Sequence, residues 1–311
     1  MDEKVGEIIS QLKEDGLLEN TIIMFWSDHG GNLLRQKSAV GNSGLNVPLI
    51  IRYPNKINAG TVDDRIVSLM DLGPTVLSLL NIEPPKHYDG KAITGKYEES
   101  PRKYAFGTAD RFDESTDMQR SVLDGRYVYI KNFMPELPLI YRNKYRERIT
   151  MNSKLIQMDS LDMLEGDAKY IFMKTKPFEE FYDLENDPYE VNNIIDDPKY
   201  ADRINNFRDA LQNWQNEIND QGFIPENKIV ESFWPNLTQP KTENVEFKIR
   251  DDGLYELTSI TNGASIGYQI EDQIGTNSWS LYYKPILLGD KQKIVARAIR
   301  LGYKASEITS N

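Results

Sequence analysis

Two side chains that can bind a metal ion stand directly after a run of apolar residues. The run is Thr21-Ile-Ile-Met-Phe-Trp26, and Asp28 and His29 follow it immediately. A continuous apolar run of this kind predicts a strand buried on both faces, and ligands bind at the carboxyl ends of strands in open α/β sheets. An oxygen-rich site of this type suits Ca²⁺ or Mg²⁺. The alternative is that Asp28 caps a turn and His29 makes an ordinary hydrogen bond within a loop.

Two cationic side chains follow on the same loop. Lys37 comes nine residues after Asp28, and Arg35 stands beside it. Because both lie over the same strand end, they can clamp an anionic oxygen. A solvated basic loop without a ligand is the alternative.

The composition excludes several classes of protein. The 311 residues contain 48 acidic and 37 basic side chains, a net charge of −11, and no basic stripe, so nucleic acid is not an expected partner. No apolar run approaches the ~20 residues of a membrane-spanning helix. Cysteine is absent, so disulfides, thiolate metal sites and a cysteine nucleophile are excluded. The only histidines are His29 and His87, too few for a multi-histidine zinc cage, and His87 is interpreted as a residue of a surface loop.

The elements that must position these residues follow from hydrophobic periodicity. Residues 3–16 predict a helix, residues 21–26 and 47–53 predict buried strands, and Asp71 is expected to cap a helix that ends at Leu80. Helix, strand, loop, strand and helix are typical of α/β folds. From about residue 103 the pattern predicts an α+β part, with strands at 104–107 and 126–131 and helices at 150–165 and 198–219.

Four segments result from this pattern. Residues 1–96 are predicted to belong to an α/β domain and residues 97–221 to an α+β subdomain. The proline-bearing stretch 222–244 predicts a linker, and the strand-rich residues 245–311 predict a small β-sandwich.

The ordered motifs over residues 3–215 resemble those of the sulfatase family, and most of all bacterial sulfatases close to the heparan N-sulfatase branch. The opening motifs surround the site residues described above, and further motifs follow in the same order along the chain. They are Ser27-Asp-His-Gly30, Leu34-Arg-Gln-Lys37, Asn42-Ser-Gly-Leu-Asn-Val-Pro-Leu-Ile-Ile-Arg52, Val67-Ser-Leu-Met-Asp-Leu-Gly-Pro-Thr75, Asn81-Ile-Glu-Pro-Pro85, Asp89-Gly90, Asp110-Arg-Phe-Asp-Glu114, Arg120-Ser-Val122, Asp124-Gly-Arg126 and Glu180-Phe-Tyr-Asp-Leu-Glu-Asn-Asp-Pro-Tyr-Glu190.

The resemblance implies a fold and a reaction. The fold would be part of an alkaline-phosphatase-like α/β sheet sandwiched by helices, followed by an α+β subdomain. The reaction would be hydrolysis of a sulfate ester or N-sulfate on a sulfated glycan. By the same resemblance Asp28 and His29 match two ligands of a Ca²⁺ ion, and Lys37 matches a lysine that contacts the sulfate. Arg35 and Arg111 are expected to face the substrate, although a salt bridge from Arg111 to Asp110 or Asp113 is an alternative.

The sequence also departs from the family pattern. Family members convert a cysteine or serine in a Cys/Ser-x-Pro-x-Arg motif to formylglycine, and this sequence contains no such motif and no N-terminal pair of aspartates. We therefore expect a chain that lacks roughly the first half of a sulfatase, has an incomplete calcium site and is inactive alone. Its expected partners are a sulfated carbohydrate and either a second copy or a chain with the N-terminal half. A periplasmic or secreted location is implied by the family, and no signal peptide is visible.

Two alternatives to this function remain open. The chain can be a non-catalytic, glycan-binding or interaction remnant of a sulfatase, or a metal-dependent phosphodiesterase of the same superfamily. The last segment resembles the chitobiase-type C-terminal β-sandwich, in the stretches 262–270, 279–286 and 292–306. There Trp279, Tyr282 and Tyr283 are expected either to form a sugar platform or to pack in the core.

Overall fold

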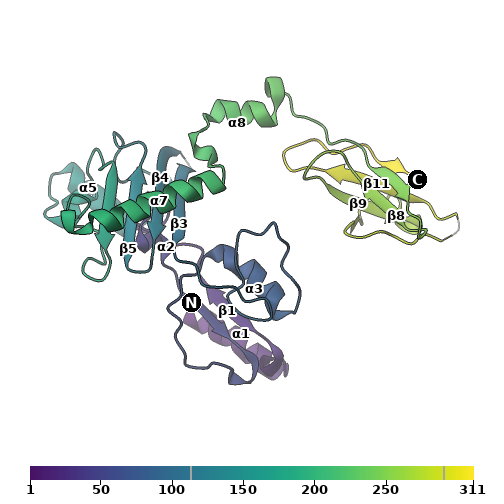
Figure 1. Cartoon of the computed structure of the whole chain (residues 1–311), viewed down its shortest axis with the longest axis horizontal. Helices are drawn as coiled ribbons and strands as arrows, with labels where there is room; N and C mark the ends of the chain where they lie inside the picture. Colours follow the sequence, from purple (N-terminus) through teal and green to yellow (C-terminus); the bar gives the residue numbers. More distant parts are fainter. Residues whose placement is uncertain (113, 290) are drawn as a thin grey trace. The chain divides into compact units, whose positions relative to one another are not determined.

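The computed structural model describes residues 1–112, 114–289 and 291–311, and these form two compact units, Met1–Asp220 and Gln221–Asn311 (Figure 1). The mixed α/β class predicted from the sequence is confirmed by this architecture. The further division of residues 1–220 at about residue 96 stays a prediction.

The first part of unit 1 contains a two-stranded antiparallel sheet and three helices. Ile23 of β1 pairs with Arg52 of β2, and Trp26 pairs with Leu49. The loop between these strands carries most of the predicted site residues. The helices and strands of this part are α1 (Asp2–Glu14), β1 (Ile23–Trp26), α2 (Asn42–Leu45), β2 (Leu49–Arg52) and α3 (Leu72–Leu79), with 3₁₀ turns η1 (Leu18–Asn20), η2 (Pro54–Lys56) and η3 (Leu69–Asp71).

The expectation that β1 and β2 are buried on both faces is wrong for the structure as described. Trp26 is 46% exposed and Ile50 is 61% exposed. The physical reason is the size of the sheet, because in the described residues β1 and β2 pair only with each other. One adjacent helix cannot cover both faces of a two-stranded sheet. Apolar side chains that the sequence predicts to be buried therefore stay in contact with solvent.

Asp71 occupies the N-cap position of α3 and Leu80 its C-cap, as the sequence predicts, but the Asp71 side chain makes no capping hydrogen bond to this helix. The helix α3 begins at Leu72, but the buried carboxylate of Asp71 accepts hydrogen bonds from the main-chain N–H groups of Ser68 and Lys91, both at 2.8 Å. It also forms an ion pair with Arg102. A carboxylate with these partners ties the loop at residues 90–102 to the start of α3.

The second part of unit 1 is a four-stranded antiparallel sheet in the order β3-β4-β5-β6, with α7 along one face (Figure 1). Ile204, Phe207 and Leu211 of α7 pack with Tyr129 and Phe181 of the sheet in one buried cluster. The remaining elements connect β5 to β6 or precede α7. The bounds are β3 (Ala105–Phe112), β4 (Ser115–Leu123), β5 (Tyr127–Asn132), α4 (Lys144–Glu147), α5 (Thr150–Ser160), α6 (Asp167–Tyr170), β6 (Glu179–Asp183), η4 (Pro198–Tyr200) and α7 (Ala201–Glu217).

The other face of this sheet is covered by the loop between β1 and β2. Val40 of that loop, which is 3% exposed, joins a buried cluster with Ala109, Val128, Ile130 and Tyr182. The loop that carries the predicted site residues is therefore packed against the α+β part of the same unit. This contact brings together residues that are far apart in the sequence.

Unit 2 contains two antiparallel sheets that share a core built from residues such as Leu257, Ile266 and Ile294. The predicted β-sandwich at 245–311 stays a prediction. The segment 222–244, which the sequence predicts to be a linker, contains the helix α8. The prolines do not interrupt this helix, because Pro225 precedes it and Pro235 follows it, at positions where helices tolerate proline. The bounds are η5 (Gln221–Phe223), α8 (Glu226–Phe233), η6 (Pro235–Leu237), β7 (Glu246–Ile249), β8 (Tyr255–Thr258), β9 (Ser265–Ile270), η7 (Glu271–Gln273), β10 (Ser280–Leu281), β11 (Ile294–Ile299) and β12 (Thr309–Ser310).

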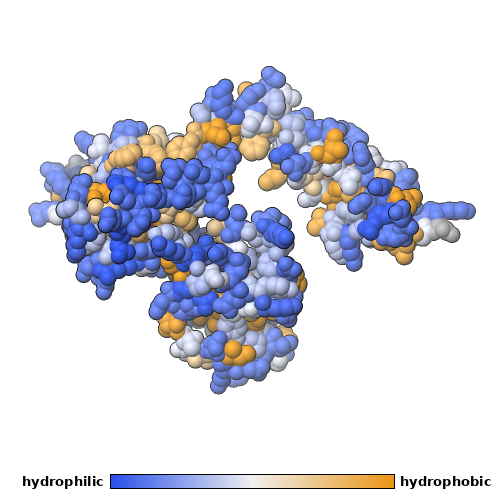
Figure 2. All heavy atoms as spheres, in the orientation of Figure 1, coloured by the Kyte–Doolittle hydropathy of each residue, from blue (hydrophilic) through white to orange (hydrophobic). Residues whose placement is uncertain are grey.

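The aromatic residues singled out in unit 2 divide between core and surface. Tyr282 packs against the buried core, whereas Trp279 is 36% and Tyr283 is 77% exposed. In the view of Figure 2 the surface of each unit is mainly hydrophilic, with scattered apolar patches. Across the residues that the structure describes, no helix is both long and apolar enough to span a membrane. His87 lies in an exposed loop, as predicted, and its ring contacts that of Tyr88 edge to face.

Candidate functional site

Asp28 and His29 begin the loop that follows β1. The Asp28 carboxylate is 80% exposed, and its Oδ2 lies 3.3 Å from Nε2 of His29. The same carboxylate accepts the main-chain N–H of His29 at 3.0 Å, and Nδ1 of His29 lies 2.7 Å from the carbonyl oxygen of Gly30. The pair is thus held in a local turn.

A calcium ion would need more ligands than this pair supplies. Ca²⁺ takes 6–8 oxygen ligands. No group of three or more His, Cys, Asp or Glu side chains that could hold a metal ion occurs in the described part of the chain. Asp28 and His29 therefore do not fit a complete calcium site by themselves.

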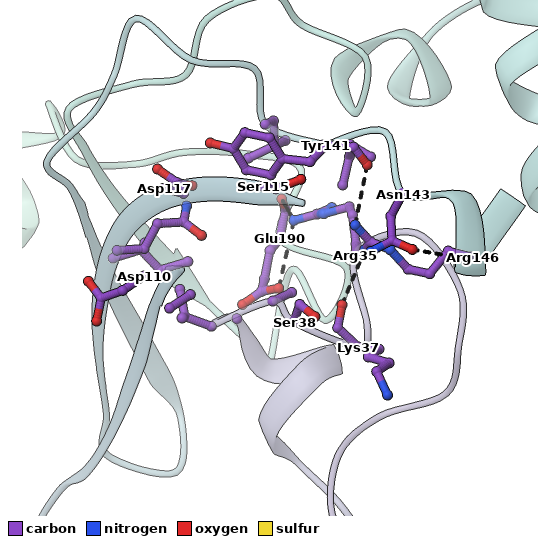
Figure 3. Close-up of a pocket in the computed structure, with 18 of the residues that line it drawn as sticks. Arg35, Lys37, Ser38, Asp110, Ser115, Asp117, Tyr141, Asn143, Arg146 and Glu190 are labelled. Carbon is purple, nitrogen blue, oxygen red and sulfur yellow. Dashed lines mark hydrogen bonds and ion pairs between the residues drawn. The ribbon is translucent and has the colours of Figure 1, made fainter. Parts of the chain in front are cut away.

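A pocket of about 80 Å³ lies where the loop at residues 35–41 meets the sheet of the α+β part (Figure 3). Of the predicted site residues, Arg35 and Lys37 line it, whereas Asp28, His29 and Arg111 are not among its lining residues. Most of its other polar lining residues come from segments that the sequence analysis left without a role. The polar lining residues are Arg35, Lys37, Ser38, Asp110, Ser115, Asp117, Gln119, Tyr141, Asn143, Arg146, Glu180 and Glu190.

Arg35 and Lys37 point in different directions. The guanidinium of Arg35 donates to the carbonyl oxygens of Tyr189 at 2.8 Å and Glu190 at 3.0 Å, so it is engaged with the loop after β6. The ammonium group of Lys37 extends away from the other labelled residues of Figure 3, and its Nζ lies 5.7 Å from the ring centroid of Tyr145. Lys37 is therefore the better placed of the two to meet an anion.

Two acidic side chains of the pocket, Asp110 and Asp117, face buried cations. Asp117 accepts a hydrogen bond at 2.7 Å from Lys176, whose side chain is fully buried, and Lys176 also donates to the hydroxyl of Tyr141 at 2.9 Å. Burial raises the pKa of Tyr141 well above its usual range, so this phenol stays protonated. Asp110 pairs with Arg120 at 2.9 Å. These acids therefore present little uncompensated negative charge.

Arg146 joins the pocket from the short helix α4. Asn143 begins this helix, and its side-chain oxygen accepts the main-chain N–H of Arg146 at 3.1 Å. The Arg146 guanidinium donates to the carbonyl oxygens of Lys37 and Tyr141, both at 3.3 Å. Sequence reasoning missed Arg146, because the signal available in this stretch, the Asn143 cap, predicts a helix start and not a contact with Lys37.

Glu190 is a second residue that sequence reasoning missed. It is 2% exposed, and its Oε1 accepts the main-chain N–H of Asn42 at 2.8 Å. Its Oε2 lies 3.7 Å from Nη2 of Arg35. Burial raises the pKa of Glu190, and the Asn42 hydrogen bond and the Arg35 charge oppose that rise. Glu190 ends the longest acidic motif of the sequence, which was the one signal that could have found it.

Arg111 lies on β3 with an exposed side chain. Its alternative partner Asp110 forms its ion pair with Arg120, and the other alternative, Asp113, lies outside the described residues. The substrate-facing role of Arg111 stays a prediction.

Comparison with known proteins gives consistent matches. The family model described as Sulfatase matches residues 1–82. An ulvan-active sulfatase of Formosa agariphila is 38% identical over 312 residues, which covers 99% of this chain and 52% of that protein. The human N-sulphoglucosamine sulphohydrolase is 25% identical over 255 residues, which covers 77% of this chain and 50% of that protein. The chain spans about half the length of these relatives.

A solved structure of a 2-O GAG sulfatase has the same fold over the matched region. Its TM-score is 0.51 at 21% identity, and the match covers 70% of this chain and 41% of that chain. At this identity the likeness concerns the fold alone.

Proposed function

Because the chain belongs to the sulfatase family, we propose that it is part of a hydrolase that removes sulfate from a sulfated glycan. The observation that carries this proposal is the 38% identity to an ulvan-active sulfatase along 99% of the chain. The pocket beside Lys37 supports it, because two of its acids, Asp110 and Asp117, are paired with buried cations while the Lys37 ammonium extends away from them.

The proposed roles follow the geometry of the loop. Lys37 would contact a sulfate oxygen, since a fixed cation stabilises the negative charge of a sulfate group. Arg35 and Arg111 would contribute to substrate binding, Arg35 chiefly by shaping the loop. Asp28 and His29 would each provide one ligand of a calcium site, and the described residues do not complete it. A periplasmic or secreted location, and association with a second chain, are further parts of this proposal.

The first prediction concerns turnover. We expect the purified 311-residue chain to release no sulfate above background, because covalent catalysis needs an activated nucleophile and the sequence contains no Cys/Ser-x-Pro-x-Arg motif. Sulfate released from an aryl sulfate and from a sulfated polysaccharide would be measured by ion chromatography, with calcium present. A form extended by an upstream segment with the motif, co-expressed with a maturation enzyme, serves as the positive arm. Turnover by the 311-residue chain alone would refute this account of the nucleophile.

The same assay separates the alternatives. An extended, matured form that binds sulfated oligosaccharide without releasing sulfate would favour a non-catalytic binding protein. Hydrolysis of a phosphate diester with zinc, and none of an aryl sulfate, would favour a phosphodiesterase. In either case the proposed hydrolysis of sulfate would be wrong.

The second prediction concerns calcium. We expect the chain to bind Ca²⁺ only weakly, with a dissociation constant above about 1 mM, because two ligands fall well short of the 6–8 that Ca²⁺ takes. Isothermal titration calorimetry on the chain and on Asp28→Asn measures this directly, and Asp15→Asn is the control for the loss of one exposed carboxylate. Micromolar binding that disappears in Asp28→Asn alone would contradict the prediction.

A further inference from the structure

We propose that Glu190 is a positioning residue that holds the loop at residues 35–42, and with it Lys37, against the α+β part of unit 1. The inference rests on the proposed function in one respect, namely that Lys37 contacts the sulfate group. The holding contact itself is a property of the structure and can be tested separately.

The loop is tied to Glu190 at both of its ends. At one end Asn42 donates its main-chain N–H to Oε1 of Glu190 at 2.8 Å. At the other end Arg35 donates to the carbonyl oxygens of Tyr189 and Glu190, and its Nη2 lies 3.7 Å from Oε2 of Glu190. Lys37 stands between these two attachments. Glu190, 148 residues further along the chain than Asn42, thus contacts both ends of the loop, through its buried carboxylate at Asn42 and through its carbonyl oxygen and carboxylate at Arg35.

Between these ends the loop approaches the carboxylate so closely that a Cβ atom at position 41 would require the carboxylate to move. A Cβ atom placed on Gly41 would come within 2.6 Å of Oε2 of Glu190 and within 2.9 Å of Oε1. Next to it, Val40 is buried against the sheet. Glu190 therefore contacts the main chain of the loop directly, and this favours glycine at position 41.

The backbone at this contact is strained at three positions. Arg35, Ser38 and Glu190 have φ angles of 57°, 66° and 54°, in the left-handed region that L-residues rarely adopt. Such conformations persist where the surrounding contacts determine them, and they gather at functional sites. Arg35 and Ser38 flank Lys37, and Glu190 is the residue that contacts the loop. The strained backbone positions and the holding contacts therefore lie at the same place in the structure.

A second tie acts on Lys37 itself. Arg146 donates to the carbonyl oxygen of Lys37 at 3.3 Å, and fixes the main chain from the side opposite to the side-chain ammonium group. With the backbone held at residues 35, 37 and 42, the ammonium group samples a smaller volume. When a sulfate group binds there, less conformational entropy of the lysine is lost, and the affinity is therefore higher.

The test measures backbone exchange and anion binding on the same variants. Glu190→Ala removes the carboxylate contacts with Asn42 and Arg35 and leaves the bonds from Arg35 to the main-chain carbonyl oxygens of Tyr189 and Glu190. Glu190→Gln keeps an oxygen that can accept from Asn42, and Glu217→Gln removes one exposed acid of α7 as the matched control. Hydrogen–deuterium exchange of residues 32–46 should become at least tenfold faster in Glu190→Ala and less than threefold faster in Glu190→Gln. The exchange of β4 and β5, and that of Glu217→Gln, should stay unchanged.

Binding of inorganic sulfate, followed by titration calorimetry, supplies the second measurement. We expect at least a fivefold weaker affinity in Glu190→Ala and Lys37→Ala, and an affinity within twofold of the unmodified chain in Glu190→Gln. Unchanged exchange in Glu190→Ala overturns the positioning role, whatever Lys37 does. A third outcome separates the two proposals. If exchange becomes faster in Glu190→Ala but Lys37→Ala binds sulfate as well as the unmodified chain, the positioning role of Glu190 stands and the anion-binding role of Lys37 is wrong.

Discussion

Replacing Arg120 by methionine is expected to lower the free energy of unfolding of unit 1 by about 3–5 kcal/mol, as breaking a buried ion pair does. Arg120 is 1% exposed and donates to both carboxylate oxygens of Asp220, at 2.8 and 2.7 Å, and to Asp110 at 2.9 Å. Methionine fills much of the same volume but leaves the buried carboxylate of Asp220 and the partly exposed carboxylate of Asp110 facing a neutral side chain. Urea denaturation, followed by the near-ultraviolet circular dichroism of the full chain, measures the change.

Arg126→Met is the matched control for this experiment. Arg126 also pairs with a buried acid, Asp183 at 2.7 Å, but the arginine side chain is 48% exposed. Because water screens the exposed guanidinium, and because Asp183 keeps hydrogen bonds from the Asn186 side chain at 2.9 Å and the main-chain N–H of Glu185 at 3.3 Å, we expect a much smaller loss than for Arg120→Met. Equal losses for the two variants would show that burial does not decide the strength of these pairs.

The elements that the sequence predicted well are those whose signal is local and repeated. Ile204, Phe207 and Leu211 recur at helical spacing and are buried on one face of α7, inside the helix predicted at 198–219. The 126–131 run likewise became β5. Periodicity reports which face of an element is covered, and here α7 and the four-stranded sheet cover each other within the described residues.

Strand burial was predicted less well, because an apolar run does not state how many neighbours the strand has. Residues 21–26 and 47–53 form strands as expected, but their apolar side chains remain partly exposed in a two-stranded sheet. Residues 222–244 differ from the prediction for another reason: their three prolines predict a linker, but Ile229, Val230 and Phe233 lie at helical spacing between two of these prolines and form part of α8.

The candidate site shows what a single sequence cannot supply. Lys37 and Arg35 were found because they stand near Asp28 in the chain, and they do line the pocket. Glu190 and Arg146 reach the same loop from positions more than 100 residues away, through contacts with main-chain atoms of Asn42 and Lys37. A contact with a main-chain atom imposes no residue type on its partner, so it leaves little trace in the sequence.

The second large effect is expected for Phe207→Ala, which should cost unit 1 about 3–5 kcal/mol, the range for removing a buried phenylalanine. Phe207 is 1% exposed, and its ring meets the rings of Phe181 and Tyr104 edge to face, each at 5.3 Å between centroids. Alanine would leave a cavity between α7 and the sheet, where the rigid strands cannot close it. Urea denaturation measures the loss in the full chain.

The control for Phe207→Ala is the neighbouring Asn206→Ala, whose side chain is exposed on the same helix, and it should leave the stability of unit 1 nearly unchanged. Residues 221–311 have their own core, so hydrogen exchange of β9 and β11 should stay the same in both variants. A loss below about 1 kcal/mol for Phe207→Ala would mean that the site can collapse around the smaller side chain, since the cost of such a change depends on how far the surroundings relax. The cluster between α7 and the sheet would then not be the main source of stability in this part of the chain.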